Sequence, residues 1–196
     1  MEKRRLALRE GYRFVTIRYN IVSNRFYFTY QYKQYEMEFF ANDLETALGE
    51  LMRVDEIWIN ELVTYQNLYG TLERILRLKR EQGAKILMLL HDFFALCPAV
   101  NLIDAKGKYC GVPSCDVCDK CVPDNRSNAC IEYGSGTLWR TKFREFLSNC
   151  DEIRAFSDDT AKLFKRAYPD VYNLHVIPHA PHYLLSLIHI SEPTRR

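Results

Sequence analysis

An alternation of apolar runs with amphipathic stretches, beginning near Asn42, constrains the fold of this chain more than any other feature of its sequence. Apolar runs that suit buried strands cover residues 57–59, 86–90, 152–156 and 174–177. Hydrophobic residues at helical spacing predict helices over residues 42–52, 68–82, 139–147 and 158–167. Strands and helices in succession are typical of a parallel sheet with right-handed crossovers. We therefore expect an α/β fold, a Rossmann-like parallel sheet with helices on both faces.

The first forty residues follow a different pattern. Two stretches, Tyr12–Tyr19 and Arg25–Tyr32, are rich in aromatic and β-branched residues. Asn20, Ser23 and Asn24 lie between them and are typical of a turn. The pattern predicts a β-hairpin that packs on an edge of the sheet or joins it to an upstream domain, and it indicates no chemistry.

The length of 196 residues allows one sizeable core and a small appendage. We expect a hairpin region over residues 1–40 and one Rossmann-like domain over residues 41–183, with a cysteine-rich insertion at residues 97–130. We expect residues 184–196 to be a non-native tail, because the sequence from Ser186 to Arg196 resembles a translated sequencing adapter. The natural protein would then continue beyond about Tyr183.

Composition argues against several classes of protein. The net charge of +2 is too small to argue for a nucleic-acid partner, and no apolar run approaches the ~20 residues that a membrane span needs. The basic N-terminus has no apolar segment after it, so it does not predict a secretory signal. We therefore expect a cytoplasmic protein without a transmembrane segment, and peripheral association with a membrane stays open.

Parallel sheets bind ligands at the carboxyl ends of their strands, so the residues directly after each predicted strand form the candidate site. They are Asn60 and Glu61, His91 and Asp92, Ser157, and His179. The His91 imidazole can bond a hydroxyl or a phosphate, and the Asp92 carboxylate can orient the imidazole or accept from a sugar hydroxyl. The alternative is that Asp92 caps a short turn and that His91 bonds to the backbone. Ser157 likewise either caps the helix that follows it or contacts a ligand.

Six of the seven cysteines lie between Cys97 and Cys130. Such clustering without a secretory signal favours metal binding or buried thiols over disulfides. Four thiolates, two of them from the C-x-x-C of Cys118 and Cys121, would suit a structural zinc ion, and the polar loop has little apolar surface with which to order itself. An iron–sulfur cluster is an alternative because Cys115 completes a ferredoxin-like spacing, although the fourth cysteine before a proline is missing. Reduced thiols in a poorly ordered loop are the third interpretation.

Several further segments occur in a fixed order. They are HDFFALCPAVNLID from His91, then KGKYC, CDKC and Trp139-Arg140, then the strand and serine at residues 153–157 and the stretch at residues 174–179. Together they resemble the N-terminal, acceptor-side domain of family 4 (group 1) glycosyltransferases. The resemblance covers roughly Val54 to His182.

This resemblance implies a retaining enzyme of the GT-B type, in which two Rossmann-like domains face each other across the active site. A sugar or glycolipid acceptor would lie mainly on this domain. The nucleotide-sugar donor would lie mainly on a second domain that this chain lacks, so the chain alone should be inactive. Carried over by position, the resemblance implies that His91 and Asp92 face the transferred sugar and are catalytic, and that Cys97, Cys110, Cys118 and Cys121 hold zinc, with Cys115 or Cys130 able to replace one of the four. From their places after the strands, we expect Asn60, Glu61, Ser157 and His179 to bind substrate.

Cell-surface polysaccharide synthesis is one setting for such a transferase. Two other functions compete with it. The glycine-rich loop that many relatives place after their first strand is not visible here. The leading alternative is a non-enzymatic zinc-binding interaction module built on the cysteine-rich insertion. A Rossmann enzyme with another nucleotide cofactor is less favoured, because no G-x-G-x-x-G follows any predicted strand.

Overall fold

The computed structural model describes residues 2–44, 53–129 and 134–178. Its N-terminal part is helix α1 (Glu2–Arg9) and an antiparallel meander of three strands, β1 (Phe14–Asn20), β2 (Arg25–Tyr32) and β3 (Tyr35–Ala41). The predicted hairpin is confirmed as β1 and β2, which pair along their whole length. The patterns discussed above predict neither α1 nor β3.

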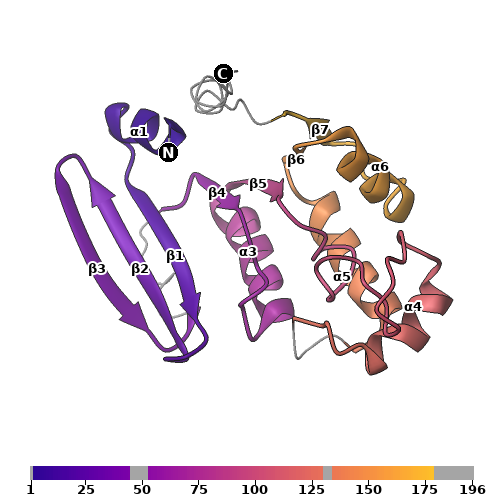
Figure 1. Ribbon diagram of the computed structural model, residues 1–196. Helices are drawn as coiled ribbons and strands as arrows, with labels where there is room; N and C mark the ends of the chain where they lie inside the picture. Colours follow the sequence, from indigo (N-terminus) through magenta and orange to yellow (C-terminus); the bar gives the residue numbers. More distant parts are fainter. Residues whose placement is uncertain (1, 45–52, 130–133, 179–196) are drawn as a thin grey trace, which may run out of the picture.

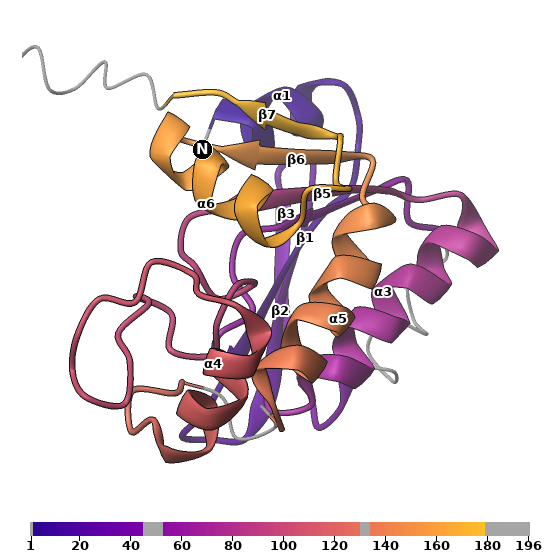
Figure 2. The same cartoon turned by 90° about the vertical axis from the view of Figure 1, so that its right-hand side faces the viewer.

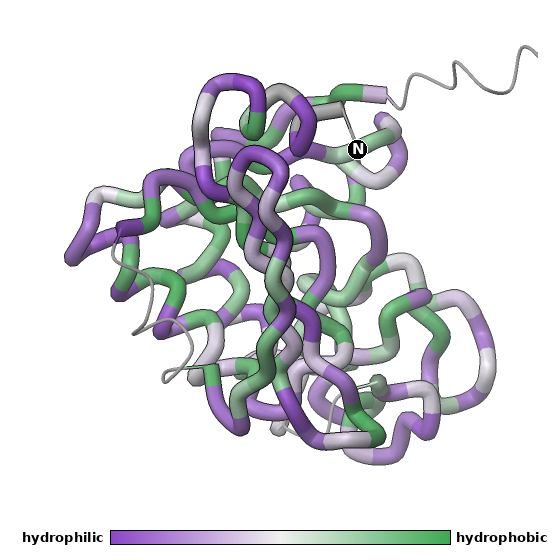
Figure 3. The backbone as a smooth tube through the Cα atoms, turned by 90° about the vertical axis from the view of Figure 1, so that its left-hand side faces the viewer, coloured by the Kyte–Doolittle hydropathy of each residue, from purple (hydrophilic) through white to green (hydrophobic). Residues whose placement is uncertain are grey.

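One face of the meander is apolar. Phe26 and Phe28 of β2 are buried there, and the ring of Phe28 stacks on Phe39 of β3 with centroids 4.9 Å apart. Figure 3 shows hydrophobic and hydrophilic residues mixed along these strands, as expected for a sheet with one buried face. Tyr65 packs against this cluster and also against the core of the rest of the molecule. It therefore joins the meander to the body, by which we mean the described residues from 54 onward.

The body is built on a parallel sheet. Its strands are β4 (Glu56–Ile59), β5 (Lys85–Leu90), β6 (Glu152–Ala155) and β7 (Leu174–Val176), in the order β4-β5-β6-β7. Strand β5 pairs with β4 on one side and with β6 on the other, both in parallel. The predicted parallel α/β architecture is confirmed. Of the helix expected over residues 42–52, residues 45–52 lie outside the described residues.

The helices of the body share one face of this sheet. α3 (Leu68–Gln82), α5 (Gly136–Ser148) and α6 (Asp158–Ala167) precede β5, β6 and β7 and lie on the same side (Figures 1 and 2). We expected helices on both faces, and the described residues differ from that. The strands follow one another in chain order, so each right-handed crossover places its helix on the same side.

The core lies between this sheet face and the three helices. Ile86, Met88 and Ile153 contribute from the strands, and Trp139 and Phe143 of α5 fill its centre without solvent exposure. Burial of apolar surface on this scale is the main source of stability for such a layer. It also fixes the strand ends that carry the candidate site.

Local chemistry determines where the helices begin and end. The side chains of Asn67, Ser135 and Ser157 accept backbone N–H bonds from the first turns of α3, α5 and α6. Helix α3 ends at Gly83, whose φ of 71° lies in the left-handed region and whose N–H bonds to the Lys79 carbonyl.

The cysteine-rich insertion runs between β5 and α5 and contains α4 (Cys115–Cys121) and a 3-10 turn, η1 (Val122–Asp124). The Asp104 carboxylate accepts two N–H bonds within its own turn, and the Asn125 side chain donates to the Ile103 carbonyl over 2.7 Å. Several apolar residues of the insertion are buried, among them Leu102, Val112 and Val122. The insertion therefore has more apolar surface to order it than its composition led us to expect.

Candidate functional site

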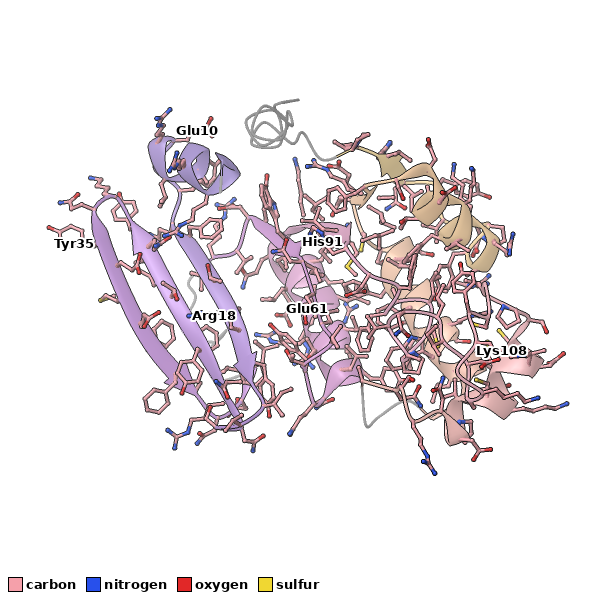
Figure 4. All side chains as sticks on the ribbon, in the orientation of Figure 1. Glu10, Arg18, Tyr35, Glu61, His91 and Lys108 are labelled. Atoms are coloured by element: carbon pink, nitrogen blue, oxygen red, sulfur yellow. The ribbon has the colours of Figure 1, made fainter. Side chains whose placement is uncertain are left out.

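The end of strand β5 places two candidate residues at the carboxyl edge of the sheet. The strand ends at Leu90, and His91 and Asp92 follow directly. Leu90 pairs with Ala155, the last residue of β6, and β4 ends two residues before that level. Figure 4 labels His91 after β5 and Glu61 after β4. Three strand ends therefore meet around His91, as the sequence predicts.

The His91 ring stacks on Phe156. The two ring centroids lie 4.6 Å apart and the ring planes are inclined by 18°. Phe156 is the first residue after β6, and the His91 side chain is exposed while Phe156 is half-buried. Phe156 therefore limits how the imidazole can turn. The sequence predicts a strand over residues 152–156, so the rule that takes the residue after each strand selects Ser157 and passes over Phe156, whereas β6 ends at Ala155.

The Asp92 carboxylate holds the turn that follows β5. Its Oδ1 accepts the N–H of Phe94 over 2.8 Å, and Phe93 N–H bonds to the Val100 carbonyl. Burial raises the pKa of Asp92 above its usual range, opposed by the bond from Phe94 and by the charge of His91. Asp92 thus caps the turn through Oδ1, as the alternative interpretation predicts. Its Oδ2 is the oxygen that can bind a ligand.

Asn60 and Glu61 follow β4 at the same edge, and both side chains are exposed. Glu61 lies close enough to Tyr65 to act on its ionisation: burial, and secondly the charge of Glu61, raise the pKa of Tyr65 to about 12. The Tyr65 hydroxyl donates to the Ile17 carbonyl of β1 at 3.5 Å. Glu61 therefore stands beside the contact between the meander and the body.

Ser157 caps helix α6. Its hydroxyl oxygen accepts the N–H of Thr160 over 3.2 Å, and its side chain lies 3.0 Å from the Thr160 hydroxyl. The capping interpretation of Ser157 is the one that the structure displays. His179 lies outside the described residues.

The carboxyl edge brings together an imidazole, two carboxylates and a side-chain amide, all suited to bonding hydroxyl groups. A separate hollow of about 320 Å³ is lined by residues of β4, β5 and β6. Its wall includes Trp58 and the Glu152–Arg154 pair but none of the edge residues. We give the edge more weight, because ligands of parallel α/β sheets bind at the carboxyl ends of the strands.

The cysteine-rich insertion docks on α5 through Cys118. A Cβ atom on Gly136 would lie 2.4 Å from the Cys118 Cβ, so a glycine is required at this close approach. Asp119 accepts bonds from the N–H and the hydroxyl of Thr137, which lower the pKa of Asp119. Helix α4 is therefore held against the first turn of α5.

Four cysteine thiols are electrostatic neighbours in this region. Burial raises the pKa of Cys97 to about 11, and Cys110, Cys118 and Cys121 each add to the shift. Burial also raises the pKa of Cys118, while the guanidinium of Arg140 lowers it. Among the residues that the structure describes, no three Cys, His, Asp or Glu side chains are arranged as a ligand set for a metal ion. The structure places the predicted cysteines in one region, but their side chains do not surround a common metal position.

Comparisons of the chain with protein-family models, curated proteins and solved structures found no match. The resemblance to glycosyltransferases therefore rests on the motifs quoted above. Within the described parts of the chain, no helix combines the length and apolar character that crossing a bilayer requires.

Proposed function

We propose that this chain is the acceptor-side domain of a retaining glycosyltransferase that uses a nucleoside diphosphate sugar. The observation that carries the proposal is the position of His91 and Asp92 at the carboxyl edge of the central parallel strand. That position is where α/β folds bind ligands, and the same two residues begin the longest motif of the resemblance.

Each edge residue has a role in this proposal. His91, held by its stack on Phe156, bonds a hydroxyl of the transferred sugar, and Asp92 accepts from a sugar hydroxyl through Oδ2. Asn60 and Glu61 contact the acceptor from the end of β4. Ser157 acts through the start of α6, which it caps.

In the reaction, the bond between the sugar and the diphosphate breaks and a bond from the sugar to the acceptor oxygen forms. The nucleoside diphosphate leaves with the bonding electrons, and the acceptor hydroxyl passes its proton to an oxygen of the departing diphosphate. Negative charge grows on the diphosphate, which the second domain would hold. The edge residues stabilise the sugar by fixed dipoles and hydrogen bonds that strengthen in the transition state.

The test uses the polypeptide encoded when the reading frame is followed past Tyr183 into a second domain. His91→Ala should lower kcat more than it raises KM, because the interaction is made chiefly in the transition state. The matched control is His175→Ala, which changes an exposed histidine within β7. Wild-type kcat in His91→Ala protein would reduce His91 to a structural residue and remove the basis of the proposal.

The interaction module remains the competing function, and the cysteine cluster is the observation that favours it. It predicts an early natural stop in the reading frame and a partner that binds the cysteine-rich insertion. A second α/β domain in that frame would exclude it.

A further inference from the structure

The outer strand of the meander has a free edge in the part of the chain that the structure describes. Strand β3 pairs with β2 on one side, in the order β1-β2-β3, and no described strand pairs with its other side. Figure 1 shows this edge on the side of the meander that faces away from the body. A free edge presents a row of backbone N–H and C=O groups that can pair with another strand.

The turn before β3 determines which of its backbone groups point outward. Tyr32 and Tyr35 pair across a turn formed by Lys33 and Gln34, so they exchange backbone hydrogen bonds with each other. Hydrogen bonding alternates along an antiparallel pair of strands. Residues 35, 37 and 39 therefore bond to β2, and residues 36, 38 and 40 direct their N–H and C=O groups to the free edge.

The side chains of β3 protect this edge poorly. Every residue of the strand except Ala41 is exposed, and the strand contains neither the lysine nor the proline with which many edges resist pairing. Tyr35 and Met37 are 64% and 60% exposed and lie on the same face of the meander as Phe39. Figure 4 shows Tyr35 on the outer side of the molecule. An apolar stripe thus continues to the free edge.

The two charged residues of β3 are already paired within the chain. A carboxylate oxygen of Glu36 lies 3.4 Å from a guanidinium nitrogen of Arg4 in α1, and Glu38 lies at the same distance from Arg18 of β1. Exposed pairs of this kind are weak, but they place positive charge beside each carboxylate. The glutamates therefore repel an approaching strand less than isolated carboxylates would.

We propose that β3 pairs antiparallel with β3 of a second copy of this chain, across a two-fold axis that passes through Glu38. The two meanders then form one continuous sheet. In this register residue 38 pairs with its own copy, and residues 36 and 40 pair with each other across the axis, so every outward-facing residue is used. The inference is independent of the proposed transferase function.

The apolar face of the two strands fits this register. Met37 lies opposite Phe39 of the second copy, and Tyr35 lies opposite its Ala41, because directly opposed residues share one face of a sheet. Each contact occurs twice, as a two-fold interface requires. Moving the axis by one residue would leave residue 36 or residue 40 without a partner inside β3. The register through Glu38 is therefore the one that we expect.

The charged face shows where the pairing gains and where it loses. Glu36 lies opposite Phe40 of the second copy, and the Arg25 guanidinium lies over the Phe40 ring, 4.7 Å from its centroid. Glu36 thus approaches a cation of the other chain. Glu38 lies opposite its own copy, and such a like-charge contact costs stability. Arg18 beside each Glu38 reduces this cost.

Sedimentation velocity of the whole chain over a wide range of concentrations tests for the dimer. We expect a reversible monomer–dimer equilibrium. Glu38→Pro should weaken association by roughly tenfold or more, because proline removes the central N–H of the pairing, and an edge strand tolerates proline where its N–H faces solvent. Glu38→Gln is the matched control, since it removes the same charge but keeps the N–H, and it should associate at least as tightly as wild type. A wild-type chain that stays monomeric, or equal weakening in both variants, would overturn the proposal.

A side-chain variant keeps the proposal testable if Glu38→Pro fails to fold. Met37→Lys places a charge opposite Phe39 of the second copy, and the lysine is solvated in the monomer because this position is exposed. It should also weaken association by roughly tenfold or more. The control is Val22→Lys, which makes the same change of charge at a residue that is 97% exposed in the turn between β1 and β2. A dimer that survives Met37→Lys, or that Val22→Lys weakens equally, would belong to another surface and would refute the pairing of β3.

Contacts between the chains test the register itself. In a mixture of isotope-labelled and unlabelled chains, isotope-filtered NMR should show the Met37 methyl group close to the Phe39 ring of the second copy. Tyr35 should show contacts with Ala41 of the second copy. Inter-chain contacts confined to α1 or to the body would contradict the proposal.

Discussion

The strands of the meander are longer than those of the body, yet they bury far less. Strands β1, β2 and β3 have seven, eight and seven residues, whereas β4 and β6 have four each and β7 has three. The buried cluster of the meander consists of Phe26 and Phe28, while the core of the body draws on β4, α3, β5, α5, β6 and α6. Local pairing between neighbouring strands therefore shapes the meander, and side-chain packing between distant segments shapes the body.

This difference explains why the candidate site belongs to the body. A site needs side chains that are held in place from several directions. His91 meets that need in two ways, because it directly follows the central strand, which pairs with β4 and β6, and its ring stacks on Phe156. In the described structure, the Tyr65 hydroxyl bonds to β1 of the meander, and Glu61 lies beside Tyr65.

The largest expected effect is the loss of the central packing residue of the body. Trp139 is fully buried, its Nε1 donates to the Phe94 carbonyl over 2.8 Å, and its ring packs edge-on against Phe94. Trp139→Ala should lower the free energy of unfolding by about 3–5 kcal/mol, as large truncations in cores do. Urea denaturation measures this, with Leu138→Ala, an exposed neighbour on the same helix, as control. Similar stability in both variants would contradict our description of the core.

Truncation of Phe28, the buried aromatic residue of the meander that matches Trp139, should destabilise the molecule less than Trp139→Ala does. Phe28 is fully buried but touches few other core residues. Phe28→Ala should speed amide exchange across β1–β3 at least tenfold and leave the amides of β5 protected, because the body does not depend on this cluster. Phe40→Ala, on the exposed face, is the control. Loss of protection in β5 would show that the two regions unfold as one unit.

These expectations also show which parts of the structure a sequence can predict. Periodicity located β4 to β7 and their helices, because each strand or helix carries its own apolar pattern. It could not show that the helices share one face, because strand order arises from packing between segments. The alternation in β3, with Glu36 and Glu38 between apolar residues, was present and overlooked. Arg140 was predictable only as a polar position in an amphipathic helix, since its burial depends on the fold of the insertion.

A cap substitution should have a modest effect confined to the body. Ser157→Ala removes the bond to the Thr160 N–H and should cost about 1 kcal/mol, the usual value of an N-cap. Ser157→Asp should restore most of it, because an aspartate also caps. Thermal denaturation distinguishes the two variants. No change in Ser157→Ala protein would return Ser157 to the list of direct ligand contacts.

The smallest effect concerns acid stability of the body. Asp151 is partly desolvated, but bonds from Lys79 and from the Ile86 N–H outweigh that and lower the pKa of Asp151. A lowered carboxyl pKa adds stability above the unfolded value of about 4 and loses it as the pH falls through the folded value. Asp151→Asn should therefore be less stable at pH 7, with a shallower loss of stability below about pH 4. Asp159→Asn, an exposed change, should follow the wild-type pH profile.

The central claim is that the carboxyl edge around His91 binds sugar. The most direct measurement follows the histidine ring resonances of the chain by NMR while methyl glycosides of common hexoses are added. The account predicts that the His91 resonances shift, that His175 in β7 stays unchanged, and that His91→Ala abolishes binding while the rest of the spectrum keeps its dispersion. Shifts that map to the cysteine-rich insertion or to the hollow over β4–β6, with His91 unmoved at high glycoside concentration, would contradict it.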